Sequence, residues 1–140
     1  MFLINMKYKN INNPEYPLEK HIDDRGEITD IFYNVNIEHI AIIKTKAGSI
    51  RGNHYHKKTV QHVLILEGQM EFWTQPYDKS KEIEMRLLNP GDMVTSSEME
   101  IHAMTFPTDN KFIVFTIGKR GGKDYEDDTY RVDNITRQKS

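Results

Sequence analysis

The stretch RGNHYHKKTVQHVLILEG at residues 51–68 places two histidines two positions apart, shortly before an apolar run. Residues i and i+2 of a β-strand project from the same face, so we expect the imidazoles of His54 and His56 to converge. Gln61 shares the parity of the apolar residues that we expect to face inward, whereas His62 has the opposite parity. The stretch therefore predicts a polar site on the inner face of a β structure.

A third histidine extends this candidate site. His102 begins a later apolar run, and in an antiparallel barrel that run can lie opposite the strand of the histidine pair. Two imidazoles, a third from a distant strand and a nearby side-chain oxygen can together hold a divalent metal ion. His54, His56, Gln61 and His102 are therefore candidate metal ligands.

The rest of the chain predicts an all-β protein. Its apolar residues come in short runs bounded by turn residues, and they do not recur at helical spacing over any long window. Short, evenly spaced runs favour an antiparallel sandwich or barrel over βαβ units. The predicted strands are 27–33, 37–45, 59–66, 69–77, 82–88, 92–97, 101–106 and 111–118.

The chain length of 140 residues predicts one domain. We expect an extended or looped N-terminal segment at 1–24, a barrel at 25–118 and a polar C-terminal segment at 119–140. The run MFLIN at residues 1–5 is a candidate for crossing to the sheet of a second copy, although a simply edge-paired or disordered N-terminus is equally consistent with the sequence.

Composition excludes several classes of function. The net charge of −2 argues against a nucleic-acid binder with a broad basic face. The absence of cysteine removes disulfides, thiolate catalysis and Cys-ligated zinc. No apolar run is long enough to span a membrane, and the N-terminus lacks the apolar stretch of a secretory signal. A cytoplasmic location is therefore expected.

These motifs resemble the two signatures of the cupin superfamily. The first signature is a His-x-His pair followed at fixed gaps by a Glu and a Gly, and the second joins a Gly to a later His. The matching residues are His54, His56, Gln61, Gly68, Gly91 and His102. The resemblance implies a small double-stranded β-helix, or jelly-roll, barrel with a site inside its mouth. Gln61 replaces the Glu of many metal-binding cupins, and a neutral amide is a weaker ligand for a hard ion than a carboxylate.

A more specific resemblance is to the dTDP-sugar 3,4-ketoisomerases, which need no metal, and more distantly to the dTDP-4-dehydrorhamnose 3,5-epimerases. It is carried by RGNHYHKKTVQ at 51–61, by DDRGEIT at 23–29 and by DYEDDTYRV at 124–132. It implies a nucleotide-sugar substrate, histidine acid–base chemistry at His54 and His56, and a homodimer.

The same resemblance implies the residues that bind substrate. Arg25 and Arg51 become candidates for the pyrophosphate, and a guanidinium can clamp a diphosphate through two parallel hydrogen bonds. Tyr55, Gln61 and His102 are the further substrate-binding candidates.

One departure leaves the reaction open. The strand before the histidine pair, IAIIKTKAG at 40–48, has neither the Arg nor the Tyr that the ketoisomerases carry there. Three hypotheses therefore remain: a metal-free nucleotide-sugar isomerase or epimerase, a metal-dependent cupin enzyme, and a sugar-binding barrel without activity.

Overall fold

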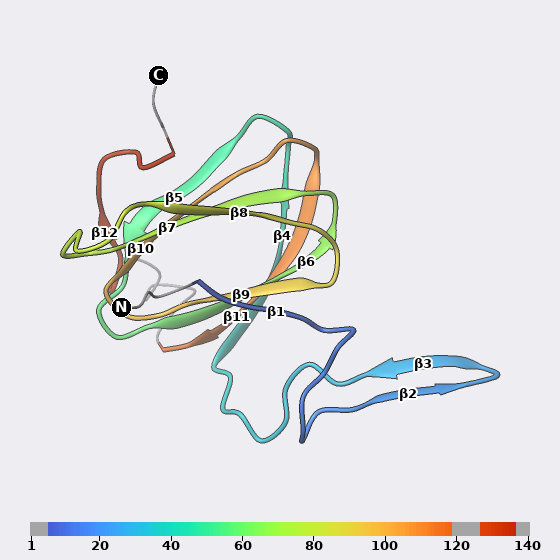
Figure 1. The fold of residues 1–140 in the computed structure, drawn as a ribbon. Coiled ribbons are helices and arrows are strands. Elements are labelled where there is room, and N and C mark those ends of the chain that lie inside the picture. Colours follow the sequence, from blue (N-terminus) through green and yellow to red (C-terminus); the bar gives the residue numbers. More distant parts are fainter. Residues whose placement is uncertain (1–5, 119–126, 137–140) are drawn as a thin grey trace.

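Two antiparallel five-stranded sheets form the body of the protein (Figure 1). A computed structural model describes residues 6–118 and 127–136. The first sheet has the order β1 (Lys7–Asn10), β9 (Asp92–Ser96), β6 (Val60–Glu67), β11 (Asn110–Ile117) and β4 (His39–Thr45). The second has the order β12 (Tyr130–Arg131), β5 (Ile50–Tyr55), β10 (Glu100–Thr105), β7 (Met70–Pro76) and β8 (Glu84–Leu88). The predicted all-β, cupin-type jelly roll is confirmed.

The main core lies between the inner faces of the two sheets. Alternate residues of each strand point inward, so the apolar positions of one parity from both sheets meet in this layer. Its buried members are Val63, Ile65, Met70, Phe72, Leu88, Val94, Met104, Phe106, Phe112 and Val114. His54 lies on β5 of the second sheet, and His56 directly follows the end of that strand.

Two smaller clusters cover the outer faces. Leu64, Met93 and Phe115 on the first sheet are covered by the connection before β4, where Phe32 contacts both Phe115 and His62. The outer face of the second sheet is covered by the C-terminal segment, which packs Ile135 there. The segment before β4 and the C-terminal segment therefore contribute to these outer clusters.

Each predicted run overlaps a strand. The strand expected for the histidine pair is β5, but it ends at Tyr55, so only His54 lies on it and His56 follows directly. The structure adds β1 within the segment expected to be extended, and it adds β12 within the polar C-terminal segment. The MFLIN run at 1–5 and residues 119–126 lie outside the described residues. Nothing in the described part of the chain is a helix that is long and apolar enough to cross a membrane.

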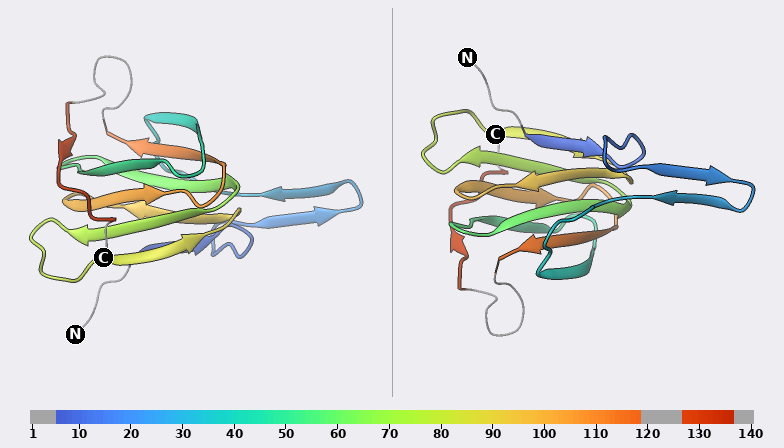
Figure 2. Two further views of the ribbon diagram at one scale, coloured as in Figure 1. Left: turned by 90° about the horizontal axis from the view of Figure 1, so that it is seen from above. Right: turned by 90° about the horizontal axis from the view of Figure 1, so that it is seen from below.

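A separate hairpin joins β2 (Lys20–Asp23) to β3 (Gly26–Thr29). It pairs with neither five-stranded sheet and extends away from the body of the molecule in both views of Figure 2. The ion pair between Lys20 and Glu27 links its two strands at 3.0 Å. Ile22 and Ile28 are 68% and 67% exposed on it. An isolated two-stranded hairpin is marginally stable in water, so we expect another protein surface to pack against these apolar side chains.

Candidate functional site

The pairing of β5 with β10 brings two of the predicted histidines together. His54 is the direct cross-strand partner of His102, and the register shifts immediately afterwards, between His102 and Ala103. Gly52 has φ +88° at this irregularity, and a Cβ there would lie 2.8 Å from the carbonyl oxygen of His102. Glycine is therefore required by both backbone conformation and space, and the close strand approach fixes His54 beside His102.

The three imidazoles of His54, His56 and His102 form one cluster. Their ring centroids are 5.0 Å apart for His54 and His56, 4.7 Å for His54 and His102, and 5.3 Å for His56 and His102. One ring nitrogen of each lies within 4.8 Å of the others. His56 and His102 are each only 2% exposed. The convergence expected from strand parity is thus present.

The ring of His56 is held from two sides. Its Nδ1 lies 2.7 Å from the backbone oxygen of Asp128, and because a carbonyl only accepts, Nδ1 carries a proton. Its Nε2 lies 3.2 Å from Oε1 of Gln61. Either a protonated ring donates to that oxygen, or a neutral ring accepts from the amide after a flip. In both arrangements Nδ1 is held by the carbonyl of Asp128 and Nε2 is directed toward Gln61.

Ser96 supports the third imidazole. Its hydroxyl oxygen lies 2.8 Å from Nδ1 of His102, and both residues are buried. The ring of Phe72 stacks on His102 with an interplanar angle of 5°. These two contacts fix the ring plane of His102, as a metal ligand or a catalytic group requires.

A cavity of about 280 Å³ opens beside this cluster. His54, Gln61 and His102 line it together with apolar residues of both sheets, whereas His56 lies beneath them. Arg51 from β5 and Arg131 from β12 also line it. Nε of Arg51 donates to Oγ1 of Thr45 at 2.8 Å, which orients the guanidinium. The cavity thus joins titratable rings to two cationic groups.

Electrostatics around the C-terminal segment favours an ionised Asp128. Burial disfavours its charged form, but three donors outweigh this effect: the backbone N–H groups of Lys57 and Lys58 and the hydroxyl of Thr59. The charge on His56 acts in the same direction, so the pKa of Asp128 falls below its ordinary value of 3.8. The carboxylate therefore holds the turn that directly follows His56.

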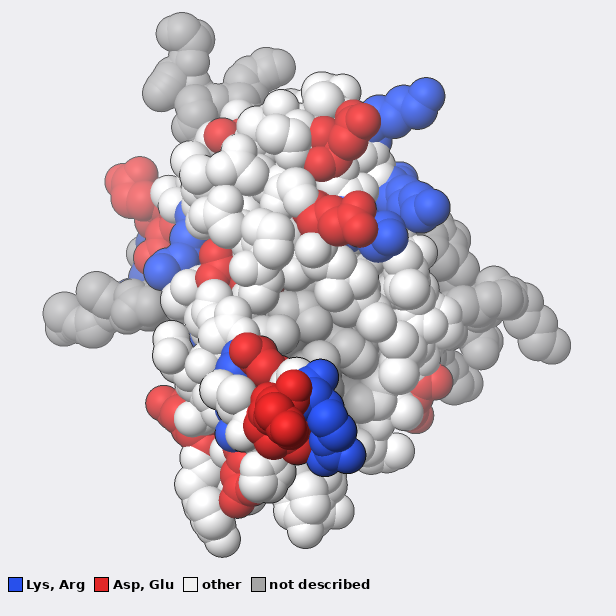
Figure 3. Space-filling model, turned by 90° about the vertical axis from the view of Figure 1, so that its right-hand side faces the viewer, with Lys and Arg blue, Asp and Glu red and all other residues white. Residues whose placement is uncertain are grey.

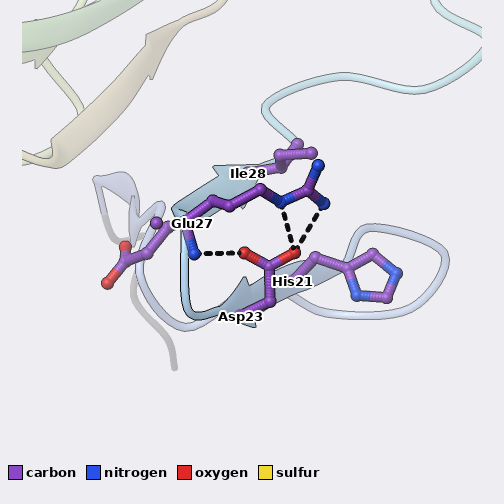
Figure 4. A pocket seen from close by; sticks show the side chains of 6 residues that line it. His21, Asp23, Glu27 and Ile28 are labelled. Atoms are coloured by element: carbon purple, nitrogen blue, oxygen red, sulfur yellow. Dashed lines mark hydrogen bonds and ion pairs between the residues drawn. The ribbon is translucent and has the colours of Figure 1, made fainter.

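Two predicted residues lie elsewhere in this chain. Arg25 occupies the tip of the β2–β3 hairpin and pairs with Asp23 at 2.7 Å, within a separate open pocket (Figure 4). Tyr55 has the opposite parity to the histidines and faces outward, where its ring stacks with Tyr130 and contacts Tyr77. Burial is the first cause of the raised pKa of its hydroxyl. Neither residue lines the cavity within one copy.

Three contributors were not anticipated as site residues: Ser96, Asp128 and Arg131. Arg131 and Asp128 fall within the resembling segment 124–132, which is the signal that could have identified them. Ser96 carries no local signal, because its role follows only from the position of β9 against β10. Among the remaining histidines, His62 points outward as expected and bonds Thr95 at 2.8 Å.

Comparisons with known proteins agree with this geometry. The family described as "Polysaccharide biosynthesis C-terminal domain" matches residues 21–130. A comparison with curated proteins found no match. Among solved structures, the sugar 3,4-ketoisomerase QdtA from Thermoanaerobacterium thermosaccharolyticum, in complex with TDP, superimposes with a TM-score of 0.71 at 20% identity. The match covers 94% of this chain and 91% of that one.

Two further structures share the fold. WlaRA from Campylobacter jejuni, a TDP-fucose-3,4-ketoisomerase, gives a TM-score of 0.70 at 17% identity, covering 90% of this chain and 88% of that one. The dTDP-4-dehydrorhamnose 3,5-epimerase from Sulfolobus tokodaii gives 0.63 at 16% identity, covering 85% and 78%. The resemblance seen in the sequence is therefore confirmed at the level of fold.

Proposed function

Because the chain belongs to the polysaccharide biosynthesis C-terminal domain family, we propose that it is a nucleotide-sugar isomerase or epimerase. The reaction would occur next to a keto group by histidine acid–base catalysis. The observation that carries the proposal is the convergence of His54, His56 and His102 at a cavity that two arginines also line. The ketoisomerases and the epimerase that share the fold act on TDP-linked sugars, and this supports the same substrate class here.

The chemistry requires a base that can reach a carbon-bound proton. His54 lines the cavity and can take the proton from the carbon beside the carbonyl, since an imidazole titrates near neutral pH. The electron pair moves into the carbon–carbon bond and leaves an enediolate oxygen. Donors from Gln61 and His102 lie at the same wall to stabilise that charge. Return of the proton to the former carbonyl carbon, with transfer of the hydroxyl proton from the neighbouring oxygen to the enediolate oxygen, completes an isomerisation. Return of the proton to the opposite face of the original carbon completes an epimerisation.

The cavity is large enough for only part of a nucleotide sugar. A volume of about 280 Å³ lies below the usual range for whole drug-sized ligands, so it accepts a pyranose ring and leaves the nucleotide outside. The diphosphate would then lie at the mouth, where Arg51 and Arg131 can bind it by charge-assisted hydrogen bonds. This binding energy orients the remote sugar against His54.

Turnover tests the proposal directly. The chelator-dialysed protein would be incubated with TDP-4-keto-6-deoxyglucose, the ligand of one structurally similar ketoisomerase, and followed by proton NMR. We expect new resonances of an isomeric TDP-sugar. Binding that raises the melting temperature without conversion of this or other 4-keto nucleotide sugars would reject catalysis in favour of a sugar-binding barrel.

A divalent metal is the second candidate, favoured by the three imidazoles and Gln61. The donor set fits a metal ion, because Nδ1 of His56 and of His102 already contact groups that would orient the rings as ligands. When bound, such an ion would polarise the sugar carbonyl. Nitrogens about 2.1 Å from a tetrahedral ion lie about 3.4 Å apart, whereas these spread to as much as 4.8 Å. The rings would have to close in, and stoichiometric metal in protein purified without a His tag would support this alternative.

The proposal includes a homodimer in the cytoplasm. The projecting hairpin exposes Ile22 and Ile28, and edge strand β4 exposes Ile40 and Ile42 at 56% and 60%. Edge strands and isolated hairpins normally need cover, which a second copy would supply. Since the hairpin extends away from the body of the molecule (Figure 2) and Arg25 does not line its own cavity, Arg25 would serve as a phosphate ligand toward the cavity of a partner.

A further inference from the structure

The C-terminal segment pairs with β5, the strand that carries His54 and ends just before His56. β12 pairs with β5, which places Tyr130 opposite Tyr55 and Arg131 opposite His54. Beyond β12, the N–H of Val132 donates to the backbone oxygen of Asn53 at 2.9 Å, and the N–H of Ile135 donates to its side-chain oxygen at 2.8 Å. We call residues 127–136 the C-terminal strap. The strap is attached along β5, next to the strand residues that carry the site.

One residue of the strap makes most of the contacts next to His56. The carboxylate of Asp128 accepts hydrogen bonds from the N–H of Lys57 at 2.9 Å, the N–H of Lys58 at 2.8 Å and the hydroxyl of Thr59 at 2.9 Å. The backbone oxygen of the same residue accepts from Nδ1 of His56 at 2.7 Å. The side chain therefore anchors Asp128 to the turn after His56, and the anchored carbonyl is aimed at the ring.

We propose that Asp128 is a positioning residue that holds the ring of His56 in the Nδ1–H tautomer and directs its Nε2 toward Gln61. The proposal rests on the proposed function and deepens it. A carbonyl cannot donate, so the hydrogen bond from Nδ1 is lost whenever that nitrogen is deprotonated. With Nδ1 held by the carbonyl, the other ring nitrogen, Nε2, is the one directed toward Gln61. Asp128 therefore acts on the site through His56, although it does not line the cavity itself.

The test combines a spectroscopic readout with kinetics. Histidine-selective ¹⁵N NMR of the intact protein reports the protonation of each ring nitrogen, and we expect Nδ1 of His56 to be protonated in the wild type. Asp128→Ala removes the carboxylate anchor, and we expect His56 to become a mixture of tautomers with kcat reduced by about 10²-fold, the cost of misplacing a reactive group by about 1 Å. KM should change little, because Asp128 does not touch substrate.

Two variants serve as controls. Asp127→Ala changes the preceding exposed carboxylate of the strap and should leave both the tautomer of His56 and kcat at the wild-type values. Asp128→Asn keeps one accepting oxygen for the turn, and we expect it to retain the Nδ1 proton and most of the activity. This rescue distinguishes positioning from a general loss of fold.

Either of two results would overturn the proposal: an unchanged His56 spectrum in Asp128→Ala, or equal activity losses in Asp127→Ala and Asp128→Ala. The failure of the proposed function would look different. In that case the wild type would show the fixed Nδ1 proton and its loss in Asp128→Ala, while no nucleotide sugar was converted by any variant.

Discussion

The identity of residue 61, a glutamine, affects whether the histidine cluster binds a metal ion or acts in acid–base catalysis. Its amide lies 3.2 Å from Nε2 of His56, at the position where many metal-binding cupins carry a carboxylate. A neutral amide leaves the cluster without a negative ligand, and a hard divalent ion gains most from charge. The amide at position 61 therefore makes this cluster a weaker metal site than a carboxylate would, in keeping with the proposed acid–base chemistry.

Gln61→Glu should convert the cluster into a better metal site. We expect the affinity for Zn²⁺, measured by isothermal titration calorimetry, to rise by on the order of tenfold, and turnover of a keto sugar to fall. Gln69→Glu, which changes an amide in the β6–β7 turn, is the matched control and should alter neither. Equal Zn²⁺ affinity in the wild type and in Gln61→Glu would show that residue 61 is no ligand.

At the residue scale, sequence parity predicted which side chains would meet. The alternation of a strand is local, so the convergence of His54 with His56 and the opposite directions of Gln61 and His62 followed from the sequence. The partners of these rings did not. Ser96 reaches His102 across the connection between β9 and β10. Asp128 reaches His56 only because the distant C-terminal segment packs against β5, and no local pattern encodes that packing.

The approach of β5 to β10 depends on a glycine. Gly52 and Gly48 both have positive φ, +88° and +87°, but only at Gly52 would a Cβ meet another backbone atom closely, the His102 oxygen at 2.8 Å. Gly52→Ala should therefore lower the free energy of unfolding by about 2–4 kcal/mol, through backbone strain and a steric clash.

Gly48→Ala separates the two causes. It carries only the cost of the left-handed backbone, about 1–2 kcal/mol, because nothing lies within 4 Å of its Cβ. Urea denaturation of both variants measures the difference. Equal losses of stability would contradict the close strand approach that aligns His54 with His102.

Asp92 fastens the first strand to its sheet. Its carboxylate accepts from the hydroxyl of Tyr8 at 2.7 Å, from the amide of Asn10 at 2.9 Å and from the N–H of Asn89 at 2.8 Å. Burial raises its pKa, but these bonds and the nearby charge of Arg86 outweigh burial and bring the pKa below the ordinary value of 3.8. The ionised form is therefore the one that stabilises the fold.

The sign of the pH dependence follows. A carboxyl whose pKa is lowered in the folded state adds stability above its unfolded pKa and loses it as the pH falls through the folded pKa. Asp92→Asn should lower the free energy of unfolding by about 1–3 kcal/mol at pH 7. The gap to the wild type should shrink below about pH 4. Denaturant titrations at several pH values check this, and a gap that widens in acid would refute it.

At the element scale, the strands with apolar periodicity could be predicted and the short polar ones could not. β1 alternates charged and polar residues, and it forms because β9 offers an edge some 85 residues away in the chain. β12 is only Tyr130–Arg131, too short to show a period, and it depends on β5. The connection that covers Phe115 likewise has no strand or helix pattern of its own.

The face of the molecule shown in Figure 3 has mixed surface charge, and no single-sign patch dominates it. That face includes the end of the hairpin, where Lys20 pairs with Glu27 and Arg25 with Asp23. Neutralised charges beside exposed isoleucines are more typical of a surface covered by protein than of one that binds a polyanion.

Dimerisation through the hairpin can be tested with one double variant. Ile22→Lys with Ile28→Lys should convert a dimer into a monomer, as measured by light scattering during gel filtration, because it puts charge into the apolar contact. Ile83→Lys, at a less exposed isoleucine outside the hairpin, should leave the dimer intact. A monomeric wild type, or a double variant that stays dimeric, would contradict dimerisation through the hairpin.

The most direct measurement of the central claim is exchange of substrate hydrogen with solvent. In deuterium oxide, with TDP-4-keto-6-deoxyglucose as the probe, we predict that the wild type incorporates deuterium at the ring carbon beside the carbonyl. His54→Asn should exchange about 10³-fold more slowly, whereas His62→Asn, on the outward face, should keep the wild-type rate. No exchange in the wild type, or an unchanged rate in His54→Asn, would contradict proton transfer by the histidine cluster.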